Sequence, residues 1–533
     1  MVNAAGKSCW AVLLVGLAVL VATAALRSAE YDEQYTMFLT AGVARPAWPN
    51  SPFEAGDVRV LQTGHGSLIG IARDLRGTDV HPPLYFWSVA LWRRLIGEGL
   101  FGARLFSVLC GLMALAAVGV IACRTGVPPA LAMLLTLGCY GFAYTAAIAR
   151  GFALAQALTL WGVAMGLSGR RKWAGTLLGT ATFANYLAVF VALVTSPAVA
   201  GGVELRSTGD EGDREVRRVV WRPDHPHPRR WRALTSPALA GEVFFGLFLL
   251  ADLWFFLAQR NSRTGQFPPF HVLAALPRLA RYAAANLFGG LPLYLPAAAQ
   301  PVAAGVFGLL ALAAAALIAA RWRHIASGAA ARRRLLSGAL APPAGLLVLG
   351  AMFHNTPIEL RYLAFAMPFV ALLLAGALGS FPAIARRVAI ALLTTIQVAS
   401  LAGLMTGSET MQPARATAAA AARVAAGGIV LLPRGNDGVG IVGAFAIESP
   451  PTQRLQIVSR GETPPQILAH LGSTRRVVLA LLAQDDDSRA TIPVLRATFD
   501  THCWRRISEG FNVIAFERVC EEGAPWASST ALP

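Results

Sequence analysis

The sequence is poor in charged residues and almost without lysine. Of its 533 residues only 14% are charged, and all basic residues except Lys7 and Lys172 are arginines. An ordinary soluble domain has roughly 25% charged residues, so the low charge excludes a water-soluble enzyme of ordinary composition. The hydrophobic share of 55% also excludes a disordered chain, which would be poor in apolar residues.

Acidic residues are scarcer than basic ones, 29 against 46, which gives a net charge of +17. Such an excess is typical of nucleic-acid binding, or of a membrane protein with basic cytoplasmic loops. Residues 406–533 contain as many acidic residues as arginines, so the excess charge lies in the rest of the chain. We therefore predict no nucleic-acid partner and a lipid bilayer as the surroundings.

Long apolar runs fill the first three quarters of the chain. The candidate spans are Trp10–Leu26, Phe101–Cys123, Pro128–Ala149, Gly151–Leu167, Trp173–Val203, Leu239–Ala258, Pro301–Ala320, Ser337–Phe353, Leu363–Leu378 and Val388–Met405. A helix over 173–203 would be about 46 Å long, too long for one upright span, so we expect two short helices there. The prediction is about eleven transmembrane helices, with ten as the alternative. The first run also resembles a cleaved signal peptide, but the many later spans favour an uncleaved one.

Basic clusters lie between alternate runs, at Arg124, 170–172, 321–334 and 386–387. The positive-inside rule makes these loops cytoplasmic. The polar insert 204–234 is then a cytoplasmic loop too. The first exterior loop, 27–82, and everything after Met405 fall outside. We expect a multi-pass protein of the inner (plasma) membrane whose exterior face is periplasmic or extracellular.

Two domains are predicted: a mainly α transmembrane domain over 1–405 and a small exterior α/β domain over 406–533. The strands expected in the second domain are 428–433, 455–458, 476–482 and 512–518, and the helices are 464–471 and 490–499.

The chain has only six cysteines: Cys9, Cys110, Cys123, Cys139, Cys503 and Cys520. The first four lie in or beside apolar runs at no metal-ligand spacing, so we expect them to pack as small apolar residues. Cys503 and Cys520 flank a predicted hairpin in the exterior domain. An oxidising compartment permits a disulfide between them, with two free thiols as the alternative.

The first exterior loop opens with an acidic cluster that contains Glu30, Asp32 and Glu33. Acidic residues at a membrane boundary can simply be solvated. Apolar surroundings raise the pKa of a carboxylate, however, so one of these side chains also suits a general base. The same loop ends with Asp79-Val-His81-Pro-Pro, where the double proline starts a helix. A lone histidine beside scattered acids is only a weak metal signal.

Three arginines stand near the outer ends of different apolar runs: Arg104, Arg150 and Arg361. A charged side chain this deep in apolar sequence is costly and is a functional candidate by default. The alternative is a helix end that is wetted by lipid headgroups. Arginine forks that converge on one point would bind a phosphate.

Four segments resemble the polytopic GT-C glycosyltransferases of the protein-mannosyltransferase and aminoarabinose-transferase type. They are Asp32-Glu33, the Asp-Val-His-Pro-Pro-Leu-Tyr segment Asp79–Tyr85, the Arg-Leu-Phe-Ser segment Arg104–Ser107 and the Arg-Tyr-Leu segment Arg361–Leu363. The resemblance covers roughly residues 1–405. The chain departs from the family at Ile148, Phe152 and Asn185, where relatives often carry glutamate, tyrosine and histidine.

The resemblance implies an integral-membrane glycosyltransferase with a polyprenyl-phosphate-linked sugar donor. Asp32 would be the catalytic base, and Glu33 would support it or help to hold a divalent metal. Arg150 and Arg361 would bind the lipid phosphate. We assign further substrate contacts to four residues: His81, Tyr85, Arg104 and Tyr362. One base and direct attack predict inversion at the sugar carbon.

The acceptor, whether a glycan, a lipid or a protein, is open. The alternatives are a lipid or small-solute transporter or flippase and a non-catalytic membrane scaffold. A transporter often has repeated halves, and the sequence shows no such repeat.

Overall fold

The computed structural model describes residues 2–196, 237–260, 268–290, 295, 298–407, 413–424 and 427–520. The polar insert 204–234 lies outside the described residues. The chain forms two compact units that interleave along the sequence. The membrane unit comprises Met1–Leu26, Ala72–Ser88 and Arg104–Thr406, and the α/β unit comprises Arg27–Ile71, Val89–Ala103 and Gly407–Pro533. The domain boundary predicted near residue 405 stays a prediction. In the structure, residues 27–71 belong to the same compact unit as the C-terminal residues.

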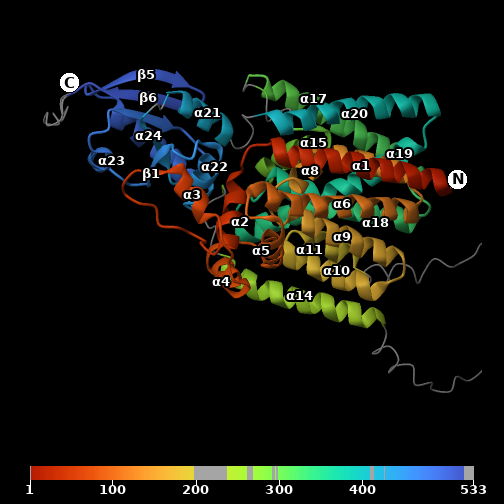
Figure 1. Cartoon of the computed structure of the whole chain (residues 1–533). Helices are drawn as coiled ribbons and strands as arrows, with labels where there is room; N and C mark the ends of the chain where they lie inside the picture. Colours follow the sequence, from red (N-terminus) through yellow and green to blue (C-terminus); the bar gives the residue numbers. More distant parts are fainter. Residues whose placement is uncertain are drawn as a thin grey trace, which may run out of the picture. The chain divides into compact units, whose positions relative to one another are not determined.

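The membrane unit is a bundle of helices (Figure 1). Its long helices are α1 (Val2–Leu26), α6 (Leu100–Thr125), α14 (Pro237–Gln259), α17 (Gln300–Ala320), α18 (Ala329–Phe353), α19 (Met367–Gly379, preceded by the 3-10 helix η2, Leu360–Ala366) and α20 (Ala383–Thr406). Its shorter helices are α4 (Leu68–Thr78), α7 (Pro129–Gly138), α8 (Tyr140–Ala146), α9 (Phe152–Leu167), α10 (Arg171–Ala184), α11 (Ala188–Thr195) and α15 (Val272–Phe288), with the 3-10 helix η1 (Trp322–His324). Helix α5 (Leu84–Ile96) continues from this unit into the other.

Seven described helices are long and apolar enough to cross a membrane, or eight if the bent pair α7 and α8 forms one span. The mainly α, polytopic architecture is thus confirmed, but the number of full-length spans is below the predicted eleven. The shortfall lies in α7 to α11. At 1.5 Å per residue, the eight-residue α11 is about 12 Å long, against a hydrocarbon thickness of about 30 Å.

Helices α10 and α14 pack at very close range because both carry glycine at their contact. A Cβ atom added to Gly175 would lie 2.3 Å from the carbonyl oxygen of Gly241. Small residues at such crossings are typical of helix pairs in membranes. Helix α14 is therefore packed tightly against α10.

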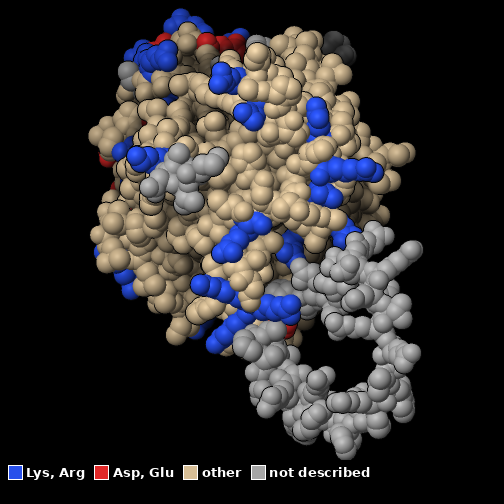
Figure 2. Space-filling view, turned by 90° about the vertical axis from the view of Figure 1, so that its right-hand side faces the viewer, with Lys and Arg blue, Asp and Glu red and all other residues tan. Residues whose placement is uncertain are grey.

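Basic side chains spread over the face of the molecule shown in Figure 2, and few acidic ones are visible there. Exposed basic residues stand at or beside the ends of the membrane-unit helices: Arg124, Arg170, Arg171, Lys172, Arg323, Arg333 and Arg387. Arg124 lies in the last turn of α6, Arg170 follows α9 and Arg323 precedes α18, and the others lie in the first two turns of α10, α18 and α20. These are the alternate helix ends that the charge pattern predicts to share one side of the membrane.

The α/β unit contains a six-stranded sheet in the order β1-β3-β2-β4-β6-β5. The strands are β1 (Phe53–Glu54), β2 (Ile429–Pro433), β3 (Arg454–Val458), β4 (Arg476–Ala480), β5 (Trp504–Gly510) and β6 (Val513–Arg518). Its helices are α2 (Tyr31–Ala41), α3 (Ala55–Leu61), α21 (Ala414–Val424), α22 (Gly440–Glu448), α23 (Pro464–Leu471) and α24 (Asp486–Phe499). Strand β2 pairs in parallel with both β3 and β4, and β1, β5 and β6 pair antiparallel.

The first exterior loop is built into this sheet. Strand β1 pairs with β3 although some 400 residues separate them, with Phe53 opposite Leu455. The side chain of Arg59 in α3 donates to the carbonyl oxygens of Ala446, Ile447 and Ser449 at the end of α22. The predicted small C-terminal α/β domain is therefore present, and it includes chain from residues 27–71.

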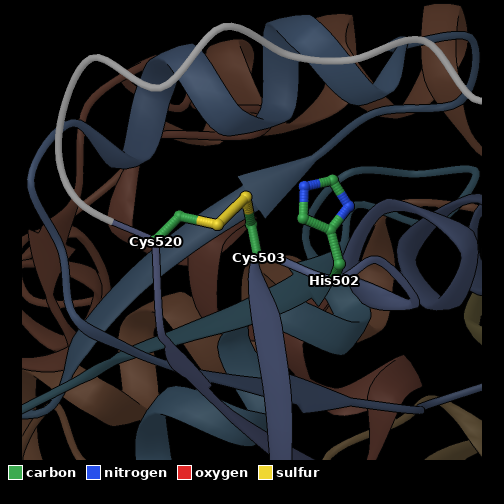
Figure 3. Close-up of side chains that lie close together, drawn as sticks. All are labelled: His502, Cys503 and Cys520. Atoms are coloured by element: carbon green, nitrogen blue, oxygen red, sulfur yellow. A yellow bond between two sulfur atoms is a disulfide. The ribbon is translucent and has the colours of Figure 1, made fainter.

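Cys503 and Cys520 form a disulfide in the structure, with their Cα atoms 4.8 Å apart (Figure 3). It closes the β5–β6 hairpin. His502 lies beside the two sulfur atoms. The three side chains do not form a metal site, because sulfur atoms bonded to each other are not the thiolates that a metal requires.

Candidate active site

A buried polar cluster joins Asp79, His81 and Arg150 in the membrane unit. The Nδ1 atom of His81 lies 3.1 Å from Oδ2 of Asp79, and the guanidinium nitrogen Nη1 of Arg150 lies 3.9 Å from the same oxygen. Asp79 and Arg150 are only 5% and 2% exposed. A charge pair so far from water persists only where the surrounding chain holds it in place.

Arg150 stands in the turn between α8 and α9. Its backbone N–H donates to the carbonyl oxygen of Ile148 at 2.8 Å, and its guanidinium lies over the ring of Phe86, 5.8 Å from the centroid. Gly151 follows because the turn passes close to its neighbours. A Cβ atom there would lie 2.7 Å from the carbonyl oxygen of Ala184 and 3.3 Å from Cβ of Tyr85. The turn therefore presents Arg150 in one fixed position.

Tyr85 is fully buried on α5, two residues after the double proline. Its hydroxyl lies 3.1 Å from the hydroxyl of Ser107 on α6, so the motif pair Asp79–Tyr85 and Arg104–Ser107 meets in space. Since the ring lies against Gly151, Tyr85 supports the turn that carries Arg150. A direct contact of Tyr85 with substrate stays a prediction.

Gln259, at the end of α14, holds the His81 backbone. Its Nε2 donates to the carbonyl oxygens of Leu75 and His81, at 2.8 and 3.1 Å, and its Oε1 accepts from the hydroxyl of Tyr186 at 2.8 Å. The sequence analysis missed Gln259, because a single amide at the end of an apolar run carries no signal.

Arg361 and Tyr362 lie in η2. Arg361 forms an ion pair with Glu359, and its guanidinium lies over the ring of Tyr362, 5.6 Å from the centroid. Tyr362 in turn stacks on Phe152, two residues after Arg150, with ring centroids 6.2 Å apart. The structure thus links the predicted residues of η2 to the start of α9, which places Arg361 and Arg150 on adjoining segments.

Arg104 is also buried, at 3% exposure, and its Nη1 donates to the carbonyl oxygen of Ala24 at 2.8 Å. This contact joins α6 to the end of α1. Its role in substrate binding stays a prediction, and the described hydrogen bond is a structural one.

Asp32 and Glu33 belong to the α/β unit, in the first turn of α2. They are 8% and 0% exposed. A carboxylate in a first helical turn is stabilised by the partial positive charge of the helix N-terminus. The Glu33 carboxylate accepts a hydrogen bond from the backbone N–H of Glu30 at 3.0 Å and so closes a capping box. Glu33 therefore holds the start of the helix, and Asp32, although also buried, is the less deeply buried of the two.

Asp252 is a buried carboxylate that the sequence analysis did not identify. It lies within α14 at 6% exposure, close to the hydroxyl of Thr182. That hydroxyl also donates to the carbonyl oxygen of Gly179 at 2.7 Å. From the sequence, a single acidic residue in a long apolar run shows only that the run is interrupted and does not predict a function.

A divalent metal finds little support among the described residues. Outside the disulfide, they bring no three metal-ligating side chains within 4.8 Å of one another. Asp79 and His81 offer two ligands, but Arg150 already places a cation beside that carboxylate.

No family model matches the chain, and no curated protein matches it in sequence. Solved structures do match. The crystal structure of ArnT from Cupriavidus metallidurans in the apo state is similar over 97% of this chain and 98% of that one, with a TM-score of 0.51 and 13% identity. The chain has the ArnT fold. The crystal structure of the same protein bound to undecaprenyl phosphate is similar over 96% of this chain and 98% of that one, with a TM-score of 0.48 and 13% identity.

The ArnT fold is the one that the motif resemblance implies, so the predicted GT-C-like architecture is confirmed. Identity of 13% makes this a likeness of fold, and the residue assignments depend on the sequence motifs and on the geometry above. At the positions where the chain departs from the family motifs, other contacts occur. Phe152 stacks on Tyr362, and the side chain of Asn185 accepts from the backbone N–H of Leu187 at 3.0 Å.

Proposed function

We propose that this protein is an integral-membrane glycosyltransferase that moves a sugar from a polyprenyl-phosphate donor to an acceptor hydroxyl on the outer face of the membrane. The observation that carries the proposal is the buried Asp79–His81–Arg150 cluster in a membrane bundle with the ArnT fold. An arginine held in place by a carboxylate and a tight turn is preorganised to bind a phosphate.

The reaction needs one base and a cationic partner for the leaving group. The acceptor oxygen attacks the anomeric carbon while Asp32 takes the hydroxyl proton. The bond between that carbon and the phosphate oxygen breaks, and the electron pair leaves with the polyprenyl phosphate. Phosphate is a good leaving group, so no strong general acid is required, in contrast to glycoside hydrolysis.

The leaving phosphate gains one negative charge as the bond breaks. Arg150 and Arg361 would neutralise that charge. Because the charge grows in the transition state, the two arginines would stabilise the transition state more than the bound substrate and so accelerate the reaction. Asp79 and His81 orient Arg150 and its surroundings. A single displacement predicts inversion at the sugar carbon. This scheme applies to any sugar on the lipid donor and to a glycan, a lipid or a protein as the acceptor.

The test uses the purified full chain in detergent with a panel of undecaprenyl-phosphate hexoses and pentoses that carry a ¹⁴C-labelled sugar. Membranes of the native host that lack this protein supply the acceptor. We expect free undecaprenyl phosphate and labelled product for one member of the panel. Uptake of labelled donor into vesicles without bond cleavage would instead support the transporter.

The variant Asp32→Asn assigns the base. It should lower turnover by at least about a thousandfold, within the range that general-base catalysis and its positioning supply, while undecaprenyl-phosphate binding stays within about twofold. The control is Asp500→Asn, an exposed acid of the same unit. Full turnover in Asp32→Asn would remove Asp32 from the mechanism.

A further inference from the structure

The α/β unit has a position where open α/β sheets ordinarily bind ligands. Strand β2 connects through α22 to β3 on one side, and β4 continues through α24 towards β5 and β6 on the other. Connections that leave two neighbouring parallel strands in opposite directions define a topological switch point at the carboxyl ends of those strands. Here that point lies between the loops that follow β2 and β4.

The chain itself occupies this point. The hydroxyl of Tyr31, the first residue of α2, donates to Oδ2 of Asp485, which follows β4, at 3.1 Å. The indole N–H of Trp48 donates to the carbonyl oxygen of Gly438, which follows β2. The amino end of α22 is also taken, because Oδ1 of Asp437 accepts from the backbone N–H groups of Val439 and Gly440 at 2.9 and 3.0 Å.

Helix α22 carries glycine where α2 lies against it. A Cβ atom on Gly440 would be 2.3 to 2.6 Å from ring atoms of Tyr31, and a Cβ atom on Gly443 would be 2.8 to 3.0 Å from side-chain atoms of Gln34. One turn further, the backbone N–H of Ala29 donates to the Glu448 carboxylate at 2.7 Å. The contacts therefore reach Ala29, just before α2, and Tyr31 and Gln34 in its first turn, on both sides of Asp32 in the sequence.

We infer that the sheet of the α/β unit serves to position α2, with Tyr31 as the positioning residue that seats Asp32 for the transfer reaction. The inference rests on the proposed function for the role of Asp32. It gives the C-terminal residues a task in the reaction: they hold the base-bearing helix, and the switch point is closed to a separate soluble ligand.

The variant Gly440→Ala tests the seat directly, because the new methyl group would overlap the Tyr31 ring. We expect amide hydrogens of α2 in the purified full chain to exchange at least tenfold faster. Turnover with the active ¹⁴C-labelled undecaprenyl-phosphate sugar should fall at least tenfold, while the KM for that donor stays within twofold. The matched control is Gly99→Ala in the same unit, where an added Cβ atom meets nothing within 4 Å.

Two further variants separate seating from general damage. Tyr31→Phe adds no bulk and removes only the hydroxyl, so it should raise α2 exchange and lower turnover about threefold to tenfold. Tyr31→Ala makes room for the methyl group, so Tyr31→Ala/Gly440→Ala should be no worse than Tyr31→Ala alone. Such non-additivity is expected only of residues in contact.

Unchanged α2 exchange in both Gly440→Ala and Tyr31→Phe would overturn the inference, as would faster exchange with full turnover. The proposed function fails differently. If Asp32 is not the base, Asp32→Asn stays active, while the exchange of α2 still reports whether the sheet holds the helix.

Discussion

At the residue scale, buried arginines of this protein divide by what they contact. Arg93, at 1% exposure, donates to the carbonyl oxygens of Met37, Gln62 and Glu98 and to the hydroxyl of Thr40. All these acceptors are neutral and belong to the chain, so Arg93 is a structural tie of the α/β unit. Arg150 instead lies beside the Asp79 carboxylate, in a turn that fixes its position.

The fork of Arg150 is expected to matter as well as its charge. Arg150→Lys keeps a cation but loses the planar donor pair that matches phosphate oxygens. We expect kcat/KM for the labelled donor to fall by about tenfold to a hundredfold, the equivalent of about 1.4 to 2.7 kcal/mol of transition-state stabilisation.

The control is Arg170→Lys, an exposed arginine after α9, which should leave transfer unchanged. Equal kcat/KM in Arg150→Lys and the wild type would show that phosphate is not bound through the guanidinium fork.

Sequence reasoning identified His81 and Arg150 as single candidates, since each is an isolated polar residue beside apolar runs. It did not show that Asp79 joins them, because that contact depends on how the α8–α9 turn meets the segment before α5. Gln259 and Asp252 gave no signal for the same reason: one polar residue in an apolar helix has no spacing to read. Whether such a residue faces a polar neighbour depends on how the helices pack, which the sequence does not show.

At the element scale, regular patterns were predictable and buried short elements were not. The expected helix 464–471 coincides with α23, and strands 428–433 and 455–458 match β2 and β3 within one residue at each end. Helix α22 was missed, because its apolar residues alternate with two glycines and are buried on all sides. Strand β1 has two residues, and its partner is some 400 residues away, so no local pattern marks it.

Asp437 is expected to make the stability of this unit depend on pH. Removal from water raises the pKa of its carboxyl above the usual value of about 3.9, and repulsion by Asp485 adds to this, while the N–H groups of Gly440 and Val439 and the charge of Arg45 oppose it. The folded state thus binds the proton more tightly than the unfolded state. This contribution to stability is complete below about pH 3.9 and is lost as the pH rises through the folded pKa.

Asp437→Asn removes the titration and keeps an oxygen that accepts from the same two N–H groups. We expect the variant to unfold at a higher temperature than the wild type at pH 8, with the gap closing towards pH 4. The measurement is thermal unfolding of the full chain in detergent between these pH values, with Asp500→Asn as the control. A gap that is constant over the whole range would contradict the assignment to Asp437.

At the scale of the whole molecule, hydropathy predicted the helical architecture correctly but overestimated the number of full-length spans. Runs of apolar residues gave helices throughout, but α7 to α11 are short or bent and carry the buried turn at Arg150. Irregular backbone at membrane depth is tolerated where protein buries it, so a site built from broken helices lowers the number of full-length spans. A hydropathy profile records the same apolar residues for a full-length span and for a pair of broken helices, so it cannot distinguish the two.

The net charge of +17 should orient the molecule, because its excess lies at alternate helix ends of the membrane unit. We predict that Ser327, between η1 and α18, faces the cytoplasm and that Ser473, between α23 and β4, faces the outside. In a background in which the four free cysteines are replaced, Ser473→Cys should react with a membrane-impermeant maleimide in intact cells. Ser327→Cys should react only after permeabilisation, and the reverse pattern would place the proposed site on the cytoplasmic side.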